Sequence, residues 1–147
     1  MKRLVCTTLC LLLLSSSIKA QNGETEIRQV IITLFDAMRN ADSAAVASLF
    51  SSDCTMQTIA TDKSGNSVVK TDAVSRFVST IGKQKPGVLD EQVVIETIKI
   101  DGPLAIVWTP YRFIYNGNYS HSGVNMFCLV NLAGQWNIQY LIDTRRK

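Results

Sequence analysis

His121, the only histidine of the chain, is the residue whose type most directly suits acid–base chemistry. The ordinary pKa of a histidine, about 6.5, allows proton transfer at neutral pH. A histidine that acts as a general base needs a second group to fix its tautomer. Asp143, in the stretch LIDTRR, is the acidic candidate on the last predicted strand. The pair of His121 and Asp143 is therefore the catalytic hypothesis that the sequence offers.

Aromatic and amide side chains near His121 in the sequence could line a ligand pocket. Tyr111 and Tyr115 are four residues apart, so they share a strand face, and both could donate a hydrogen bond. Asn125 shares a strand face with His121 and could orient a carbonyl group. Small-molecule pockets consist mainly of apolar and aromatic side chains with a few polar groups. The predicted pocket residues are Trp108, Tyr111, Tyr115, Asn125 and Phe127.

The same residues also have purely structural explanations. A lone histidine beside a turn often bonds a backbone carbonyl or faces water. Asp143 is followed by Arg145 and Arg146, so an ion pair explains it as well as catalysis does. Trp108 and Phe127 could belong to the core, because large aromatic residues dominate cores as well as pockets.

Helices are predicted in the first half of the chain. A second short helix is expected in NADSAAVASLF, capped by Asp42 or Ser43, and a third in TDAVSRFVSTIG, capped by Thr71 or Asp72 and ending at Gly82. Before them, from Glu24, apolar residues recur at steps of three and four and predict an amphipathic helix. Its apolar face comprises Ile27, Val30, Ile31, Leu34, Phe35 and Met38.

Strands are predicted in the second half. The segments EQVVIETIKI, LAIVWTPYRFIY, YSHSGVNMFCLVNL and WNIQYLIDT are rich in β-branched and aromatic residues, and the turns DGP, NGN and AGQ separate them. Short turns favour consecutive antiparallel hairpins. Since the helices come first and the long strands last, we expect an α+β domain with the N-terminal helices packed on one face of a curved antiparallel sheet.

The strand that begins at His121 has two partly apolar faces. One face carries Gly123, Asn125, Phe127 and Leu129, and the other carries Ser122, Val124, Met126, Cys128 and Val130. Such a strand is expected to be covered on both sides. The helices would cover one face. Loops or the long first helix would cover the other face, or else a second copy of the chain would, which would make a homodimer through the outer sheet face.

Residues 1–20, MKRLVCTTLCLLLLSSSIKA, have the layout of a secretory signal peptide: a basic start, a short apolar run and small residues before Ala20. We expect cleavage there, one domain over residues 21–147, a periplasmic or secreted protein, and no membrane attachment after cleavage. Loss of Lys2, Arg3 and Lys19 leaves twelve basic and twelve acidic residues. This balance attracts no polyanion, so we expect no nucleic-acid partner.

Two cysteines, Cys54 and Cys128, remain after that cleavage. They could form a disulfide in an oxidising compartment, or stay free as small hydrophobic residues. One histidine and two cysteines provide no cluster with metal-ligand spacing, so we expect no metal. We also expect no cofactor.

The order of elements resembles the nuclear transport factor 2-like superfamily, a cone-shaped α+β fold that includes SnoaL-like polyketide cyclases and ketosteroid isomerases. The closer resemblance is to secreted bacterial proteins of the SnoaL-like, lumazine-binding-like group. The stretches AIVWTPYRFIYNG, SHSGVNMFCLV and GQWNIQYLIDTRR carry it. It implies a deep pocket between sheet and helices. It transfers no reaction, because the catalytic sets of the enzymes in the superfamily cannot be placed on this chain residue by residue.

Three functional hypotheses follow. The first is a secreted protein that binds a small, mostly apolar molecule between sheet and helices. The second is a cofactor-independent acid–base enzyme, an isomerase, dehydratase or hydrolase that uses His121 with Asp143 or a tyrosine. The third is a dimeric interaction protein with a closed pocket. Binding ranks first because the aromatic strands carry few polar groups.

Overall fold

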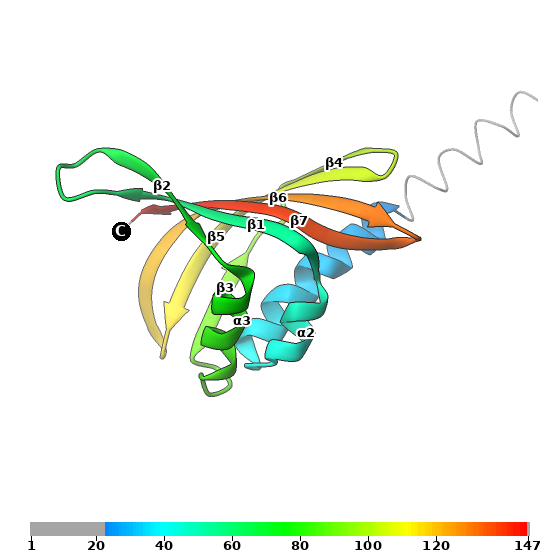
Figure 1. Cartoon of the computed structure of the whole chain (residues 1–147). Coiled ribbons are helices and arrows are strands. Elements are labelled where there is room, and N and C mark those ends of the chain that lie inside the picture. Colours follow the sequence, from blue (N-terminus) through cyan, green and yellow to red (C-terminus); the bar gives the residue numbers. More distant parts are fainter. Residues whose placement is uncertain (1–22, 147) are drawn as a thin grey trace, which may run out of the picture.

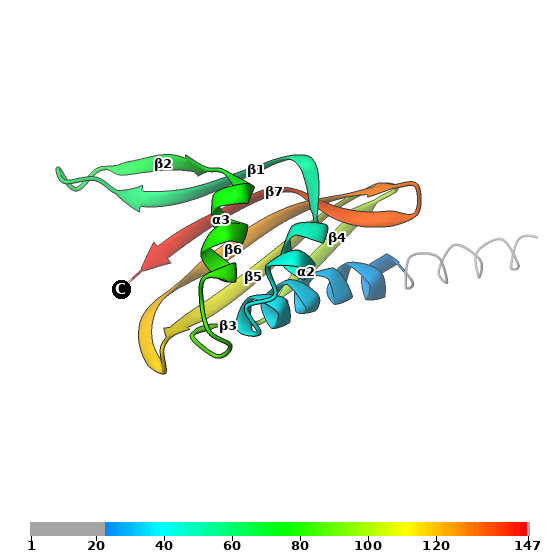
Figure 2. The ribbon, with the colours of Figure 1, turned by 60° about the horizontal axis from the view of Figure 1, so that its bottom comes forward.

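The computed structural model describes residues 23–146, and the predicted signal peptide lies outside these residues. Within them, a curved sheet of seven strands is covered on one face by three helices (Figure 1). A view from another side shows the same two layers, with the hairpin of β1 (Phe50–Thr61) and β2 (Ser67–Asp72) extending past the helices (Figure 2). None of the helices in residues 23–146 has the length and apolarity needed to cross a bilayer.

The N-terminal helix, residues 23–39, follows the predicted apolar spacing. α2 (Ser43–Ser48) begins after Asp42, whose carboxylate accepts a hydrogen bond from the N–H of Ala45 (2.9 Å), as predicted. α3 (Val74–Gly82) begins later than predicted. Its N-cap residue is Ala73, and the carboxylate of Asp72 accepts the N–H of Ala73, which precedes the helix. The buried face of the N-terminal helix consists of Ile27, Ile31, Leu34, Phe35, Ala37 and Met38.

The sheet runs in the order β2-β1-β7-β6-β5-β3, with β4 also paired to β5. All neighbouring strands are antiparallel except β1 and β7, which are parallel. The α+β prediction is confirmed, but the sheet is mixed rather than wholly antiparallel. The strands are β1 (Phe50–Thr61), β2 (Ser67–Asp72), β3 (Leu89–Val93), β4 (Thr97–Asp101), β5 (Leu104–Tyr115), β6 (Asn118–Leu132) and β7 (Gln135–Arg146).

The segment EQVVIETIKI, predicted as one strand, is divided between β3 and β4. Both strands pair with β5, and the chain between Val93 and Thr97 leaves the regular ladder. The N–H of Val94 still donates to the carbonyl of Pro110 (2.9 Å). A proline has no N–H to return, so the ladder loses a hydrogen bond at this position and the strand is interrupted.

Tight turns close the long hairpins. Asn116 and Gly117, between β5 and β6, have φ values of 49° and 78°. Ala133 and Gly134, between β6 and β7, have φ values of 52° and 88°. Positive φ at both central residues is typical of the type I′ turn, whose twist matches that of the flanking strands. The hairpins predicted from NGN and AGQ are therefore confirmed.

The strand alternation predicted for β6 is confirmed. Asn125, Phe127 and Leu129 are buried on the helix-facing side, whereas Met126 and Cys128 are half-buried on the other side. β5 alternates in the same way, with Val107 and Tyr111 among its inward residues. The core therefore fills the space between the N-terminal helix and the inward residues of β5, β6 and β7.

Cys54 and Cys128 are both free. Cys54 packs against the core on the helix-facing side of β1. Cys128 lies on the outer side of β6, where it pairs with the exposed Ile106. Because the two thiols lie on opposite faces of the sheet, the disulfide that the sequence left open is not formed.

Candidate ligand-binding site

Two neighbouring cavities lie between the sheet and the helices. The first cavity has a volume of about 140 Å³ and the second about 180 Å³. They share five lining residues, so they adjoin each other. The shared residues are Met38, Phe77, Glu91, Asp143 and Arg145. The apolar lining of the first cavity comes from the N-terminal helix, α3 and three strands: Leu34, Phe35, Met38, Met56, Phe77, Phe127 and Leu141.

A row of polar residues crosses the helix-facing side of the sheet beside this apolar lining. Strand pairing places Thr109 of β5 beside Asn125 of β6, Asn125 beside Asp143 of β7, and Asp143 beside Thr58 of β1. We call these four residues the polar row. Thr109 and Asn125 are 0% and 5% exposed. Four strands thus present polar side chains at the same level of an otherwise apolar interior.

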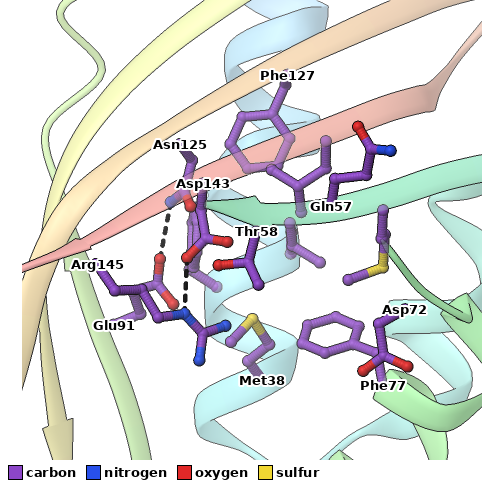
Figure 3. Close-up of a pocket in the computed structure, with 14 residues that line it drawn as sticks. Met38, Gln57, Thr58, Asp72, Phe77, Glu91, Asn125, Phe127, Asp143 and Arg145 are labelled. Carbon is purple, nitrogen blue, oxygen red and sulfur yellow. Dashed lines mark hydrogen bonds and ion pairs between the residues drawn. The ribbon is translucent and has the colours of Figure 1, made fainter. Parts of the chain in front are cut away.

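Glu91 extends the polar row from the edge strand β3 (Figure 3). Its Oε1 accepts a hydrogen bond from Nδ2 of Asn125 at 2.8 Å. The neighbouring residue, Asp90, accepts a hydrogen bond from Nε of Arg39 at 2.7 Å, and this ion pair ties β3 to the end of the N-terminal helix. The ion pair thus holds β3 against the helix, and the hydrogen bond from Asn125 holds the Glu91 carboxyl group toward β6.

The environment of Glu91 favours its protonated form. Removal from water raises the pKa of the carboxyl group to about 7, and the negative charge of Asp143 acts in the same direction. The hydrogen bond from Asn125 and the charge of Arg145 oppose the rise in pKa but do not cancel it. Glu91 is thus a carboxyl group that can gain or lose a proton near neutral pH.

Asp143 accepts hydrogen bonds from two residues on the cavity wall. Its Oδ2 accepts hydrogen bonds from Nε of Arg145 at 2.9 Å and from the hydroxyl group of Tyr111 at 3.3 Å. The same hydroxyl group lies 2.9 Å from the carbonyl oxygen of Thr144. Burial, with the charges of Asp143 and Glu91, raises the pKa of Tyr111 well above its ordinary value. Tyr111 therefore acts as a neutral donor toward Asp143.

Gly123 makes room for Tyr111. The two residues are paired across β5 and β6. A Cβ atom at position 123 would lie 2.7 Å from the Tyr111 ring and would overlap the carbonyl oxygen of Thr144. Only glycine allows the ring to lie this close to the backbone, and the ring position sets the hydroxyl group beside Asp143.

Thr58 contributes an unsatisfied hydroxyl group to the first cavity. Its Oγ1 is buried and has no hydrogen-bond partner among residues 23–146. Figure 3 shows this hydroxyl group on the side of Thr58 that faces Asp143. A buried polar atom without a partner carries a desolvation cost, which a bound molecule could offset by hydrogen bonding.

His121 lines the second cavity rather than the first. Its ring lies edge-on to Tyr111 (5.7 Å between centroids) and 5.1 Å from the ring of Phe113. Its Nδ1 is 3.0 Å from the hydroxyl oxygen of Ser120. Burial lowers the pKa of His121, the positive charge of Arg145 lowers it further, and Asp143 partly offsets the decrease.

The structure brings His121 and Asp143 to the same cavity wall without joining them. Both line the second cavity, yet the hydrogen bonds that the described residues give Asp143 come from Tyr111 and Arg145. The ion pair with Arg145, the structural alternative considered for Asp143, is present. Catalysis by His121 and Asp143 stays a prediction.

Two of the five predicted pocket residues line the first cavity and one lines the second. Asn125 and Phe127 line the first cavity, and Tyr111 lines the second. Trp108 and Tyr115 line neither. Trp108 is 45% exposed on the outer face, because it lies three positions before Tyr111 and side chains at odd offsets along a strand point to opposite faces. Tyr115 is exposed at the hairpin end of β5, beyond a register shift after Phe113.

Glu91 was not among the residues predicted for the site, although a local signal was present. Within β3, Leu89, Glu91 and Val93 alternate with more polar neighbours, so the carboxylate occupies an inward position of a strand. An acidic residue on the apolar face of a strand is unusual and points to function or to a buried partner. Thr58 and the aromatic residues from the helices carried no comparable signal.

Within residues 23–146, no three histidine, cysteine, aspartate or glutamate side chains are grouped so that they could hold a metal ion. The polar side of the first cavity instead consists of amide, hydroxyl, carboxyl and guanidinium groups. Groups of these types can bind an organic molecule through hydrogen bonds and charge.

No family model matches the sequence, and no curated protein is significantly similar to it. Solved structures, by contrast, are similar in fold. A scytalone dehydratase-like protein of Novosphingobium aromaticivorans superposes with a TM-score of 0.70 at 15% identity over 89% of each chain. An NTF2-like protein of unknown function from Shewanella baltica gives a TM-score of 0.67 at 17% identity, covering 86% of this chain and 95% of that chain.

A third structure, an NTF2-like protein with a cystatin-like fold from Novosphingobium aromaticivorans, gives a TM-score of 0.69 at 12% identity, over 90% of this chain and 87% of that chain. At such low identities the similarity concerns the fold and not the activity. It agrees with the α+β architecture described above. The chain has the fold of the nuclear transport factor 2-like superfamily.

Proposed function

We propose that this protein binds a small, mostly apolar molecule in the first cavity, with the polar end of the molecule at Glu91 and the polar row. The observation that carries the proposal is the hydrogen bond between Glu91 and Asn125, which brings two polar groups together on the wall of a cavity that seven apolar side chains also line. A mostly apolar cavity with a few convergent polar groups is the usual form of a small-molecule site. The unsatisfied hydroxyl group of Thr58 provides one further bonding position.

Benzyl alcohol is a suitable first probe, because a dry cavity of about 150 Å³ can hold a benzene ring. We expect its addition to shift the amide NMR signals of residues around the first cavity. Thr58→Ile fills part of the cavity and should weaken binding about fivefold or more. Thr55→Ile, an exposed position on the same strand, is the matched control and should leave binding unchanged. Absence of any shift at saturating probe would refute this proposal.

A second candidate function, cofactor-independent proton transfer, is favoured by one observation. The pKa of Glu91, about 7, suits a general acid or base at neutral pH better than the lowered pKa of His121 does. For any molecule found to bind, exchange of its acidic hydrogens in deuterated water would report such chemistry. Exchange should stop in Glu91→Gln and continue in Glu96→Gln, since Glu96 is exposed outside the cavity.

We further propose that the mature protein is secreted or periplasmic and forms a homodimer through the outer sheet face. The apolar residues Leu104, Ile106 and Trp108, each 45% exposed on β5, support a self-complementary apolar contact. Sedimentation of wild type and Ile106→Glu tests the dimer, with Ile32→Glu on the N-terminal helix as the control. A wild-type protein that sediments as a monomer at high concentration would exclude it.

A further inference from the structure

We propose that the molecule bound in the first cavity is an organic cation, an ammonium group on a small apolar body, with Glu91 as its counter-ion. The inference rests on the proposed binding function and adds the chemical class of the ligand. It follows from the partners of Glu91, the charges around it and the type of the surrounding side chains.

Glu91 has no cationic hydrogen-bond partner in the described part of the chain. Its one side-chain partner there is the amide of Asn125, which leaves Oε2 available to the cavity. Buried carboxylates are normally paired with a cation, because an isolated buried charge is costly. An ammonium group at the end of a ligand would supply the missing partner at this position.

The charged groups that face Glu91 from the adjoining elements leave this side of the first cavity with a negative electrostatic potential. Asp143 and Arg145 of β7 form an ion pair, and at Glu91 the field of Asp143 outweighs that of Arg145. Tyr111 of β5 is neutral, and His121 of β6 is mainly neutral above its lowered pKa. Asp72, at the far side of the cavity, adds a carboxylate that is paired with Arg76 at 3.3 Å and therefore adds little net charge. An anionic ligand would be repelled.

The apolar residues around the cavity suit a cation better than other hydrophobic linings would. Three of them, Phe35, Phe77 and Phe127, are aromatic. Aromatic faces attract ammonium groups through the ring quadrupole, and desolvated sites strengthen the attraction. Met38 and Met56 add polarizable sulfur atoms. The volume, about 140 Å³, limits the apolar body to about the size of one aromatic ring.

Three probes of the same shape and different charge test the inference: benzylammonium, benzyl alcohol and benzoate, titrated into the mature protein and followed by amide NMR. At about pH 8 we expect benzylammonium to bind about tenfold more tightly than benzyl alcohol, the factor expected for one charge-assisted hydrogen bond. Benzoate should bind most weakly of the three.

The pH dependence has a defined direction. An alkylammonium probe stays protonated over this range. Because only the ionised form of Glu91 pairs with it, the affinity for benzylammonium should rise about tenfold between about pH 6 and about pH 8, while that for benzyl alcohol should not rise. Glu91→Gln should remove both the preference for benzylammonium over benzyl alcohol and the rise in benzylammonium affinity with pH. Glu96→Gln, which removes an exposed carboxylate of the next segment, should retain them.

The outcomes separate the two proposals. If none of the probes binds, the proposed function fails, and the inference fails with it. If benzyl alcohol or benzoate binds as tightly as benzylammonium at about pH 8, the cavity still binds small molecules but the ligand is not a cation. The comparison of the three probes needs only wild-type protein, so it decides the question even if Glu91→Gln does not fold.

Discussion

Two rows of side chains cross the sheet at the same level, one on each face. One row is polar and the other is apolar. The inner one is the polar row. The outer one consists of the apolar residues Trp108, Met126 and Ile142, each adjacent in sequence to a member of the polar row. Soluble proteins usually place apolar residues inside and polar ones outside, so this pair of rows is inverted at one level of the sheet.

In the proposals above, the same strands serve ligand binding on one face and contact with a second copy on the other. A buried polar group costs free energy unless it is paired, and within the polar row the hydroxyl groups of Thr58 and Thr109 have no hydrogen-bond partner among residues 23–146. Exposed Trp108 has no such cost, but it marks an outer surface suited to contact with another apolar surface. Because strand residues alternate between faces, one set of strands can line a binding cavity and present a contact surface without either constraining the other.

The largest loss of stability should come from a substitution in the core, on the inner face of the sheet. Phe127 is fully buried and packs edge-on against Phe35, with 6.2 Å between the ring centroids. Phe127→Ala should reduce the free energy of unfolding by about 3–5 kcal/mol. Its neighbour on the outer face, Met126, is half-buried, and Met126→Ala should cost about 1 kcal/mol or less in dilute protein. Urea unfolding measures both, and equal losses would contradict the assignment of the two faces.

Gly123→Ala should have the next largest effect. The added methyl group would overlap the carbonyl oxygen of Thr144 and press on the ring of Tyr111. We expect a loss of about 1–3 kcal/mol in the free energy of unfolding. The outward neighbour provides the control, since Ser122→Ala should change stability by about 0.5 kcal/mol or less. A fully stable Gly123→Ala protein would show that Tyr111 is not held against the backbone.

Glu91→Gln should change stability in a pH-dependent manner. Unfolded chains lose the Glu91 proton near pH 4.5, whereas the folded protein keeps it up to about pH 7. The folded state therefore binds more protons in this window, so the contribution of Glu91 to stability is present below pH 4.5 and is lost as the pH rises through 7.

Glutamine keeps the hydrogen-bonding shape without the charge, so above about pH 7 Glu91→Gln should be more stable than wild type by about 1–3 kcal/mol. The difference should vanish below pH 4.5. Urea unfolding at a series of pH values measures it, with Glu96→Gln as the control. A constant difference at all pH values would mean that the Glu91 pKa is not raised by folding.

The smallest expected effect is on the titration of His121, the only imidazole and thus a single NMR signal. Arg145 lowers the pKa of His121 and Asp143 raises it. Arg145→Gln should therefore raise this pKa, and Asp143→Asn should lower it further. Arg146→Gln, at the exposed end of β7, should have less influence than Arg145→Gln. If neither Arg145→Gln nor Asp143→Asn changes the pKa of His121, then His121 does not interact electrostatically with these two residues.

Local patterns were sufficient to predict much of the fold. The apolar spacing of the N-terminal helix, the Asp42 cap and the two faces of β6 were all correct, because each depends on residues close together in sequence. The parallel pairing of β1 with β7 could not be predicted in this way. Thr55 pairs with Tyr140, and no property of either segment alone specifies such a distant partner.

The site was less accessible to prediction than the fold. Asn125, Phe127 and Tyr111 were placed on cavity walls because strand alternation determines their faces. Trp108 was included for its aromatic character, although the same alternation puts it outside. Glu91 matters through its distance to Asn125, and that distance depends on how β3 is tied to the helix through Asp90. Relations between separate elements of this kind appear only in three dimensions.

The position of the last strand has a consequence for the order in which the protein can assemble. β7 lies inside the sheet between β1 and β6, although it follows all the other strands in sequence. During synthesis, β1 and its hairpin partner β2 emerge early but have no inner neighbour until Gln135–Arg146 has been made. Closing such a distant contact is slow relative to forming local hairpins. The apolar side of β1 therefore remains exposed until β7 has been made, and partly folded chains with exposed apolar surface are prone to aggregation.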